Sequence, residues 1–301
     1  MSRRSGAGQA RADIGIIGGS GLYEMEGLTQ VREARIKTPF GDPSGPVILG
    51  QLEGRRVAFL ARHGQGHRFS PSTINYRANI YALKAIGVSQ VLSVSAVGSM
   101  RETIQPGHVV LPDQFLDWTK RRASTFFDAD VVAHVGLAEP VCGRLGQIVE
   151  QATRSVGAVA HRGGSYLCIE GPQFSTKAES HLYRSWHVSV IGMTNMPEAK
   201  LAREAELCYA TIALVTDYDC WHETEEAVQV EAILTVLRQN VLLAKRLLRE
   251  VVGQLEEKAV CGCQQALKGA IITAPEAIPA AARTRLHLLI GRYIEAKKGR
   301  G

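Results

Sequence analysis

The sequence predicts an α/β fold built as a single domain. Apolar β-branched runs alternate with amphipathic helical segments along the 301 residues, and no Pro/Gly/Ser-rich linker or internal repeat divides them. Strand–helix–strand order favours a mostly parallel sheet covered by helices, because crossover connections bring consecutive strands into one sheet. With 45% apolar and 21% charged residues, the composition is that of a soluble globular protein.

Strands are predicted where apolar runs are bounded by turn residues. The stretch DIGIIGGSGL begins at Asp13 and predicts a short strand that runs into a glycine turn. Residues 1–12 before it are rich in Gly, Arg and Ser and are expected to form a disordered tail, which leaves 13–301 as the domain. Further strands are predicted at 47–52, 56–61, 88–95, 107–111, 165–169, 188–193 and 209–215.

Two helices are marked by capping residues. Ser70 is a candidate N-cap with Pro71 at the first helical position, and this helix is predicted to end at Gly87. A longer helix is predicted to start at Thr224, and its apolar residues recur at three- and four-residue steps as far as Leu255. Such a stripe indicates packing against the core.

The net charge of +6 predicts attraction for small anions and not for nucleic acid. The basic residues are spread along the chain, and their local clusters are short, at 3–4, 120–122 and 297–298. No apolar stretch approaches the 18 or more residues that a membrane span needs, and the first residues lack the apolar core of a secretory signal. The sequence therefore predicts a cytoplasmic protein without a membrane partner.

The six cysteines are too sparse for a disulfide scaffold. They lie at positions 142, 168, 208, 220, 261 and 263, and they lack the paired two-ligand spacings of a zinc site. The sequence therefore predicts no metal site. Cys261 and Cys263 flank a single glycine, which fits either two ordinary thiols in a surface segment or a redox-active or stabilising pair.

Two glycine-rich stretches suit the binding of an anion. In GIIGGSGL, Ser20 stands among glycines just after a strand, where backbone N–H groups and a hydroxyl can hold an oxyanion. Taken alone, this stretch is more typical of a plain tight turn, because it fits neither the dinucleotide fingerprint nor the nucleotide P-loop. In ARHGQGHRFSP, Arg62 and His63 end a strand, two glycines at 64 and 66 allow close backbone approach, and His67 and Arg68 follow. Arginine and histidine together favour phosphate binding.

Small and polar residues follow two other strands. In SVSAVGSMRE, Ser95 and Ala96 leave space at the carboxyl end of a strand, which is where parallel α/β sheets bind ligands. In VIGMTNMPEAKLAREA, Met193 and Thr194 follow an apolar run, and Pro197 then opens a helix with an acidic first turn.

The stretch VTDYDCW ends a buried strand in two carboxyl groups. Asp217 and Asp219 stand one residue apart beside Trp221. Two carboxylates near each other in an apolar pocket resist joint ionisation, and burial raises their pKa further. Without other information, the bare motif fits a capping aspartate followed by a solvated one.

Taken together, these stretches resemble the methylthioadenosine phosphorylases, members of the trimeric class of purine nucleoside phosphorylases. The resemblance is strongest over 13–255, and its motifs are GIIGGSGLY, TPFGDPSGP, ARHGQGHRFSPSTINYRANIYALK, GSMRETIQPGHVVLPDQFLDWT, IEGPQFSTKAES, MTNMPEAKLAREAELCYA and TDYDCWHE. It implies a single α/β domain with a mixed sheet that curls towards a barrel, assembled as a homotrimer. The implied reaction is phosphorolysis of 5′-methylthioadenosine to adenine and 5-methylthioribose 1-phosphate, with inorganic phosphate as co-substrate and no metal or organic cofactor.

The resemblance also implies the roles of site residues. A phosphate site falls on Ser20, Arg62, His63, Ser95, Ala96 and Thr194. The ribose and base contacts fall on Met193, Phe174 and Ser175, with Asp217 and Asp219 as the catalytic acids. The methylthio group is expected in an apolar slot formed by Val230, Ile233 and Leu234, together with His134 of a neighbouring subunit.

The chemistry of adenine as a leaving group explains the acidic pair. Departing adenine develops negative charge on its imidazole ring, which a carboxylic acid near ring nitrogen 7 can neutralise by protonation. A carboxylate can accept a hydrogen bond from the 6-amino group but cannot donate one to a 6-oxo group, so Asp217 points to 6-aminopurines.

Two other functions remain open at this stage. A broader purine nucleoside phosphorylase acting on adenosine, inosine or guanosine would share every phosphate-site motif. A non-catalytic protein that binds nucleosides or nucleic acid is the alternative from another class, although the chain has no continuous basic stripe. Some heat-adapted members of the family carry a Cys-X-Cys linked to disulfides where Cys261 and Cys263 stand, which leaves both an oxidised and a reduced pair open.

Overall fold

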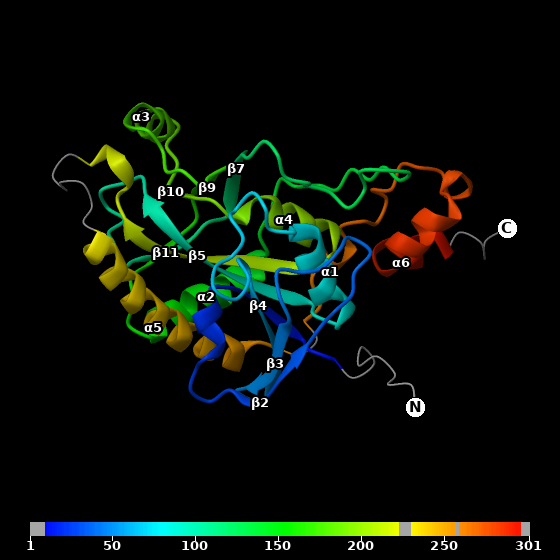
Figure 1. The fold of residues 1–301 in the computed structure, drawn as a ribbon, viewed down its shortest axis with the longest axis horizontal. Coiled ribbons are helices and arrows are strands. Elements are labelled where there is room, and N and C mark those ends of the chain that lie inside the picture. The colour runs from blue at the N-terminus through cyan, green and yellow to red at the C-terminus, as the bar shows by residue number, and fades with distance from the viewer. Residues whose placement is uncertain (1–9, 223–229, 257–258, 296–301) are drawn as a thin grey trace.

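One mixed sheet of eleven strands organises the computed structural model, which describes residues 10–222, 230–256 and 259–295 (Figure 1). The strands are β1 (Ile14–Gly18), β2 (Thr29–Ala34), β3 (Val47–Leu52), β4 (Arg55–Ala61), β5 (Gln90–Ser99), β6 (Val109–Leu111), β7 (Gln114–Trp118), β8 (Ala160–Arg162), β9 (Ser165–Ile169), β10 (Val190–Gly192) and β11 (Cys208–Asp217). The helices are α1 (Tyr76–Ala85), α2 (Gly143–Ser155), α3 (Lys177–Ser185), α4 (Asn195–Glu204), α5 (Val230–Gln254) and α6 (Ala280–Glu295).

Strand β5 is the branch point of this sheet. The main path runs β2-β3-β4-β1-β5-β10-β9-β7, and β11 joins the other edge of β5 and carries β6 and β8. The strand pairs β1–β4, β1–β5 and β5–β11 are parallel, whereas β2–β3, β3–β4, β5–β10 and β6–β11 are antiparallel. The predicted α/β class with a mixed sheet is thus confirmed.

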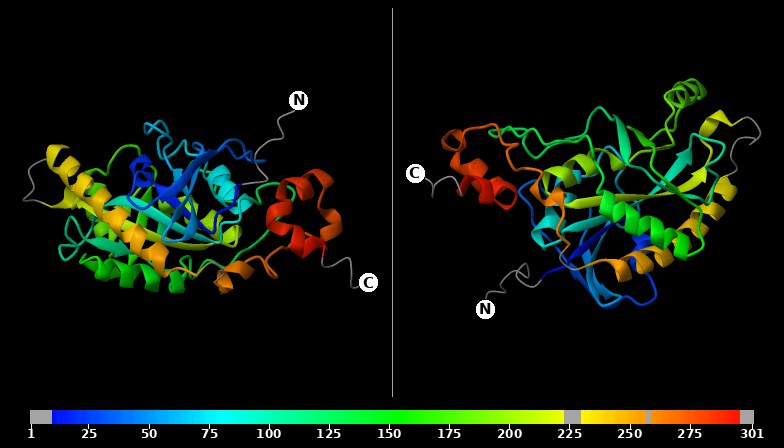
Figure 2. Two further views of the ribbon diagram at one scale, coloured as in Figure 1. Left: turned by 90° about the horizontal axis from the view of Figure 1, so that it is seen from below. Right: turned by 180° about the vertical axis from the view of Figure 1, so that it is seen from behind.

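The sheet is covered by helices on both faces, and the strands are apolar on both faces for that reason. In β1, Ile14 and Ile16 pack in one cluster with α2 and α5, whereas Ile17 packs in another with α1 and α4. Figure 2 shows α2 and α5 together on one face. Each such fully buried isoleucine contributes about 1.5–3 kcal/mol relative to an exposed one. This burial on both sides holds the strand ends, and therefore the site, in place.

The helix after Ser70 begins later than the sequence predicts. Residues 70–73 form a hydrogen-bonded turn, in which the Thr73 N–H donates to the Ser70 carbonyl at 3.0 Å. The helix α1 starts at Tyr76, and the Asn75 side chain is its N-cap, accepting from the Ala78 N–H at 3.1 Å. The predicted N-cap at Ser70 is wrong, because Asn75 is also fixed by its donation to the Phe40 carbonyl, a contact that the local sequence does not reveal.

The other element predictions agree with the structure to within a few residues, with three strands missed. Strands β2, β7 and β8 were not predicted. Strand β2 is exposed along most of its length, β7 shows only a weak alternation of apolar and polar residues, and β8 spans only three residues. The predicted start of the long helix at Thr224 lies outside the described residues, and from Val230 the helix continues to Gln254. Its residues Ala244, Leu248 and Val251 are fully buried, as the apolar stripe predicts.

None of the described helices combines enough length with enough apolar character to cross a membrane.

The C-terminal segment is attached to the rest of the fold at several points. Ile271 forms a β-bridge with Ala133, and the Tyr293 hydroxyl donates to Glu206, which also pairs with Arg292. Helix α6 lies at one end of the molecule, close to the C-terminus (Figure 2).

Glu204, at the end of α4, is expected to make stability depend on pH. Burial raises the pKa of Glu204 from 4.5 to about 7, although its carboxyl accepts from the Thr125 hydroxyl and the Phe126 N–H, both at 2.7 Å. A raised pKa in the folded state stabilises the protein below pH 4.5, and this contribution is lost as pH rises through 7. The amide of Glu204→Gln does not ionise, and it can accept from the Phe126 N–H while its NH2 group donates to the Thr125 hydroxyl oxygen. The variant should therefore gain roughly 3 kcal/mol relative to wild type between pH 4.5 and 8. Urea unfolding at both pH values measures this gain, and a difference that does not change with pH would contradict the assignment.

Candidate active site

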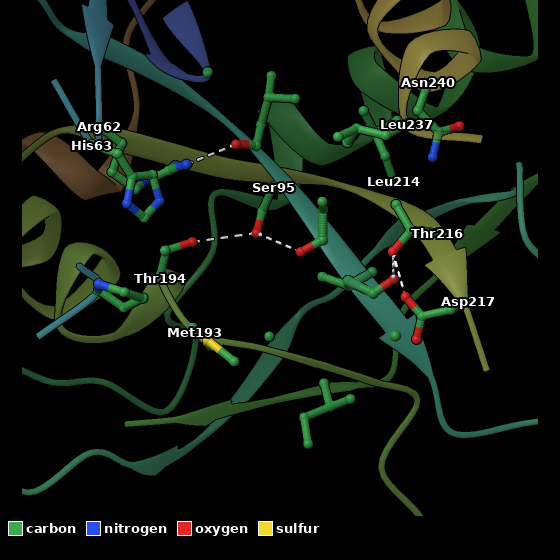
Figure 3. A pocket seen from close by; sticks show the side chains of 18 of the residues that line it. Arg62, His63, Ser95, Met193, Thr194, Leu214, Thr216, Asp217, Leu237 and Asn240 are labelled. Carbon is green, nitrogen blue, oxygen red and sulfur yellow. Dashed lines mark hydrogen bonds between the residues drawn. The ribbon is translucent and has the colours of Figure 1, made fainter. Parts of the chain in front are cut away.

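The sheet opens at the second half of β5, and this opening forms one wall of a cavity. Strand β1 accompanies β5 only as far as Ser93, and β10 joins the same edge at Gly98. Among the described residues, 94–97 have no strand partner on that edge, so their backbone faces a cavity of about 580 Å³ (Figure 3). Cavities of this size and position are typical of small-molecule sites in α/β sheets.

Ten of the residues predicted for the site line this single cavity. They are Arg62, His63, Ser95, Ala96, Phe174, Ser175, Met193, Thr194, Asp217 and Asp219. The side chain of Ser20 lies outside the described residues, although Gly19 and Gly21 on either side of it line the cavity.

Arg62 enters the cavity from the end of β4, held by a carboxylate that is far away in sequence. Its Nε and Nη2 donate to the two carboxyl oxygens of Glu198 at 2.8 and 3.0 Å, and both side chains are buried. Its Nη1 donates to the Val94 carbonyl at 2.8 Å, at the open edge of β5. Burial alone would lower the pKa of Arg62, but Glu198 raises it above its ordinary value, so the guanidinium stays charged. One Nη1 hydrogen has no acceptor among the described residues and is available to a ligand.

His63 stands next to Arg62 as a neutral imidazole. Its Nδ1 lies 2.8 Å from the Phe69 carbonyl oxygen, which only accepts, so Nδ1 carries the hydrogen and Nε2 is left as an acceptor. Burial lowers the pKa of His63 to about 4, and the charge of Arg62 adds to this shift. The ring of His67 stacks on that of His63 at 4.1 Å between centroids and also lines the cavity.

Hydroxyl groups complete this basic end. The Ser95 hydroxyl lies 3.3 Å from that of Thr194 and 3.2 Å from that of Tyr166, as Figure 3 shows for Ser95 and Thr194. Thr194 precedes α4, whose first regular turn begins at Pro197 because Met196 is extended. Three hydroxyls, from β5, β9 and the residue before α4, therefore meet at Ser95.

The two carboxyl groups lie at the other end of the cavity. Asp217 pairs with Gly98 across a β-bulge, and its Oδ1 accepts from the Asp219 N–H at 2.9 Å. Its Oδ2 lies 2.6 Å from the Thr216 hydroxyl. Ser95 and Gly98 are three residues apart on β5, which separates the two ends of the cavity by about 10 Å.

Asp219 is positioned by a turn and not by the strand. It begins a short 3-10 turn with φ of 52°, and its Oδ2 accepts from the Ser180 hydroxyl of α3. The buried Trp221 anchors this turn, because its Nε1 donates to the Ser99 carbonyl at 2.7 Å. Burial raises the pKa of Asp219, and the neighbouring Asp217 contributes to that rise, while Ser180 opposes it.

The close approach of the acidic pair to β5 depends on Gly98. A Cβ atom there would lie 3.0 Å from the Asp217 Oδ1 and 3.2 Å from the Ile191 side chain. Any larger residue would therefore displace the carboxyl group or the β10 strand.

Met193 lies between the two ends, held in place by a buried arginine that the sequence analysis missed (Figure 3). Arg122 Nη1 donates at 2.7 Å to the carbonyls of both Met193 and Met196, and its Nη2 donates at 2.6 Å to the Glu170 carbonyl. The side chain of Arg122 is 1% exposed. In the sequence it was one member of a short basic cluster, and nothing local distinguishes it from a surface charge.

Phe174 and Ser175 lie on the segment between β9 and α3. The ring of Phe174 borders the cavity yet is 82% exposed in this chain, so it forms part of the rim. The Ser175 hydroxyl is buried without a hydrogen-bond partner among the described residues. A buried hydroxyl of this kind at a cavity wall is suited to contacting a ligand.

Helix α5 supplies an apolar wall. Leu237, Val241 and Ala244 line the cavity, and Asn240 beside them donates to the Val215 carbonyl at 2.9 Å. The predicted methylthio contacts Val230, Ile233 and Leu234 precede them at the same helical spacing, but their side chains lie outside the described residues.

Among the predicted site residues whose side chains the structure describes, His134 is the one that does not line this cavity. It is exposed, and its N–H donates to the Ala270 carbonyl at 2.9 Å. The sequence analysis predicts that His134 contacts the methylthio group in the site of a neighbouring subunit. The structure of a single chain does not test this contact, which stays a prediction.

Residues 13–253 match the profile of the phosphorylase superfamily. The chain belongs to this superfamily. The S-methyl-5′-thioadenosine phosphorylase of Koribacter versatilis is 56% identical over 288 residues, covering 96% of this chain and 99% of the relative. This phosphorylase is therefore similar to that relative well past Leu255, so the C-terminal segment is part of the shared chain.

Solved phosphorylase structures have the same fold. A methylthioadenosine phosphorylase from an Antarctic soil metagenomic library is 50% identical, with a TM-score of 0.90 over 93% of this chain and 99% of that one. The methylthioadenosine phosphorylase of Schistosoma mansoni in complex with adenine is 36% identical, with a TM-score of 0.78 over 86% and 97% of the two chains. The resemblance predicted from the motifs is confirmed by these similarities.

Proposed function

We propose that this chain catalyses the phosphorolysis of S-methyl-5′-thioadenosine to adenine and 5-methylthioribose 1-phosphate. The observation that carries the proposal is one cavity with a basic, hydroxyl-lined end about 10 Å from an acidic pair. That spacing leaves room for a sugar between a nucleophilic anion and a purine. Relatives named for this reaction match the chain over nearly its whole length and support the choice of substrate.

Inorganic phosphate is the co-substrate in this proposal, and no further cofactor takes part. It is proposed to bind at the basic end through Ser20 and through five residues that line the cavity there, namely Arg62, His63, Ser95, Ala96 and Thr194. Arg62 offers its free Nη1 hydrogen, and the hydroxyls of Ser95 and Thr194 donate beside it. Neutral His63 accepts at Nε2, so it receives a hydrogen bond from a protonated phosphate oxygen. A phosphate oxygen that makes none of these hydrogen bonds attacks the anomeric carbon.

The acidic pair stabilises adenine as it leaves. The bond between the anomeric carbon and the base breaks with its electrons on the purine, and negative charge spreads over the imidazole ring. Burial raises the pKa of Asp219, and the neighbouring Asp217 adds to this rise, which favours the protonated form of Asp219. In the proposed reaction, the pair starts with one proton. That proton passes to ring nitrogen 7, and the remaining carboxylate accepts from the 6-amino group. Phe174 stacks on the base from the rim, and Ser175 contacts it with its unpaired hydroxyl.

The sugar lies over Met193, whose backbone is fixed by Arg122. The methylthio group then points to the apolar wall of α5, where Leu237 and Val241 extend the predicted slot of Val230, Ile233 and Leu234. An apolar slot favours a thioether over a hydroxyl because burying an unpaired hydroxyl is costly.

The active assembly is proposed to be a homotrimer in which His134 closes the methylthio pocket of a neighbour. Exposure of His134 outside its own cavity supports this arrangement. An exposed aromatic pair, Trp118 on β7 and Trp186 after α3, also offers an apolar surface for subunit contact.

Relative rates on three nucleosides test the proposed function. We expect kcat/KM to be highest for methylthioadenosine, lower for adenosine, and at least ~100-fold lower for inosine, because a carboxylate facing a 6-oxo group is left unpaired. The measurement is purine release in the presence and absence of phosphate. If inosine were cleaved fastest, or if release needed no phosphate, the proposed reaction would be wrong.

A further inference from the structure

Four cysteines far apart in sequence meet at one point of the fold. The Sγ atoms of Cys142, Cys208, Cys261 and Cys263 all lie within 4.8 Å of one another, and those of Cys142 and Cys261 are 3.6 Å apart. All four are free thiols, three of them buried and Cys261 half-buried. None of the four lines the active-site cavity.

The backbone holds three separate segments so that these thiols converge. Cys142 immediately precedes α2, and its N–H donates to the Tyr209 carbonyl at 2.9 Å. Cys208 is the first residue of β11, and its N–H donates to the Ser89 carbonyl at 2.9 Å. Cys261 and Cys263 flank Gly262, where a short 3-10 turn begins. The sulfur atoms are therefore positioned by regular structure and not by a flexible loop alone.

The geometry of the cluster matches one tetrahedral metal centre. Four thiolates around zinc at about 2.3 Å lie roughly 3.8 Å apart, which is close to the separations found here. Disulfide bonds would bring sulfurs together in pairs, and pairing does not require all four to be mutually close. Cys142 also stands at the start of α2, where unpaired backbone N–H groups favour a thiolate.

We propose that Cys142, Cys208, Cys261 and Cys263 bind one Zn²⁺ ion per chain. Four soft thiolates select zinc over magnesium, calcium or manganese. With four protein ligands the ion has no open position, which is the pattern of a structural and not a catalytic site. The spacing of the cysteines did not predict this site, because only one pair of ligands is local in the sequence.

The proposed ion joins the C-terminal segment to the body of the domain. Cys208 and Asp217 are at opposite ends of β11, about 30 Å apart, so the metal is remote from the reaction. The segment that follows Cys263 contains Ala270, whose carbonyl accepts from the His134 N–H, and Ile271, which forms an isolated β-bridge with Ala133. Zinc is therefore expected to stabilise the attachment of this segment without entering the chemistry.

The first test is the metal content of the full-length protein purified under reducing conditions without chelator. We expect about one zinc per chain by inductively coupled plasma mass spectrometry, and at least a tenfold lower content in Cys261→Ser and Cys263→Ser. Cys220→Ser, a cysteine outside the cluster, is the matched control and should keep its zinc. Replacement of zinc by Co²⁺ should produce the visible bands of tetrahedral cobalt and thiolate-to-cobalt charge transfer.

A second measurement uses only the wild-type protein, so its result does not depend on whether the cysteine variants fold. Modification of the wild-type thiols with a mercurial should release one zinc per chain, detected with a chromogenic chelator. The proposal is overturned if fully reduced protein supplied with zinc under anaerobic conditions binds none, or if the cysteine variants bind as much as wild type. It is also overturned if the four cysteines form disulfides in protein purified with reductant. These readouts do not depend on the substrate, so they stand apart from the proposed function.

Discussion

Replacing Asp217 by alanine is expected to lower kcat for methylthioadenosine phosphorolysis by roughly 10²- to 10⁴-fold. The substitution removes the carboxyl group that pairs with Gly98 across the β-bulge and that accepts from the Asp219 N–H. Adenine would then lose the acceptor for its 6-amino group, and Asp219 would lose the neighbouring charge that helps to raise its pKa, so protonation of the imidazole ring would be impaired as well. Steady-state kinetics at saturating phosphate measure the loss.

Two further variants make this result specific. The exposed Asp42 is a matched control, and Asp42→Ala should keep wild-type turnover. Asp217→Asn should lose turnover with methylthioadenosine but gain relative rate with inosine, because an amide donates to a 6-oxo group. Asp217→Ala should sediment like wild type, because the substitution lies in the cavity and is expected to leave the proposed assembly intact. Wild-type activity in Asp217→Ala would show that the acidic pair does not serve the leaving base.

Replacing Glu198 by alanine is expected to destabilise the fold by about 3–5 kcal/mol, because the charge of the buried Arg62 is left without a partner. The same carboxylate also accepts from the hydroxyls of Ser93 and Tyr209 at 2.6 and 2.9 Å, and both would lose their acceptor. Urea unfolding measures the change. Addition of phosphate should recover part of the lost stability, since an anion in the cavity replaces the missing charge.

The exposed Glu276 provides the control for this prediction. Glu276→Ala should change the free energy of unfolding by no more than about 0.5 kcal/mol. A loss below about 1 kcal/mol in Glu198→Ala would contradict the view that the ion pair with Arg62 positions the phosphate site.

The positions of the predicted site residues illustrate what local sequence determines. Arg62, Ser95 and Asp217 each stand at the end of an apolar run, and the carboxyl ends of parallel strands meet at one edge of a sheet. The sequence therefore predicts that these three side chains approach one another, although it does not give the register in which the strands pair. The two-sided apolar character of β1 and β11 likewise predicts helices on both faces, because such strands need cover on each side.

Partnerships across long stretches of chain were decided only by the tertiary structure. Glu198 lies 136 residues after Arg62, and Arg122 holds the Met193 carbonyl from 71 residues away. In the sequence, Glu198 is a plain helix-opening acid and Arg122 a plain basic residue, because burial and not residue type makes them important. The edge strands β2 and β7 were missed for a related reason, since one exposed side weakens the apolar pattern that marks a strand.

By itself, then, the sequence determined the α/β class, the family motifs and ten of the residues that line the cavity, because these depend on short-range patterns. Only the tertiary structure decided the branching of the sheet at β5, the start of α1 at Tyr76 and the meeting of the four cysteines. Each of these depends on contacts between segments distant in the chain. The spacing of residues along the sequence does not predict these contacts, because they form only when distant segments pack against each other in the folded domain.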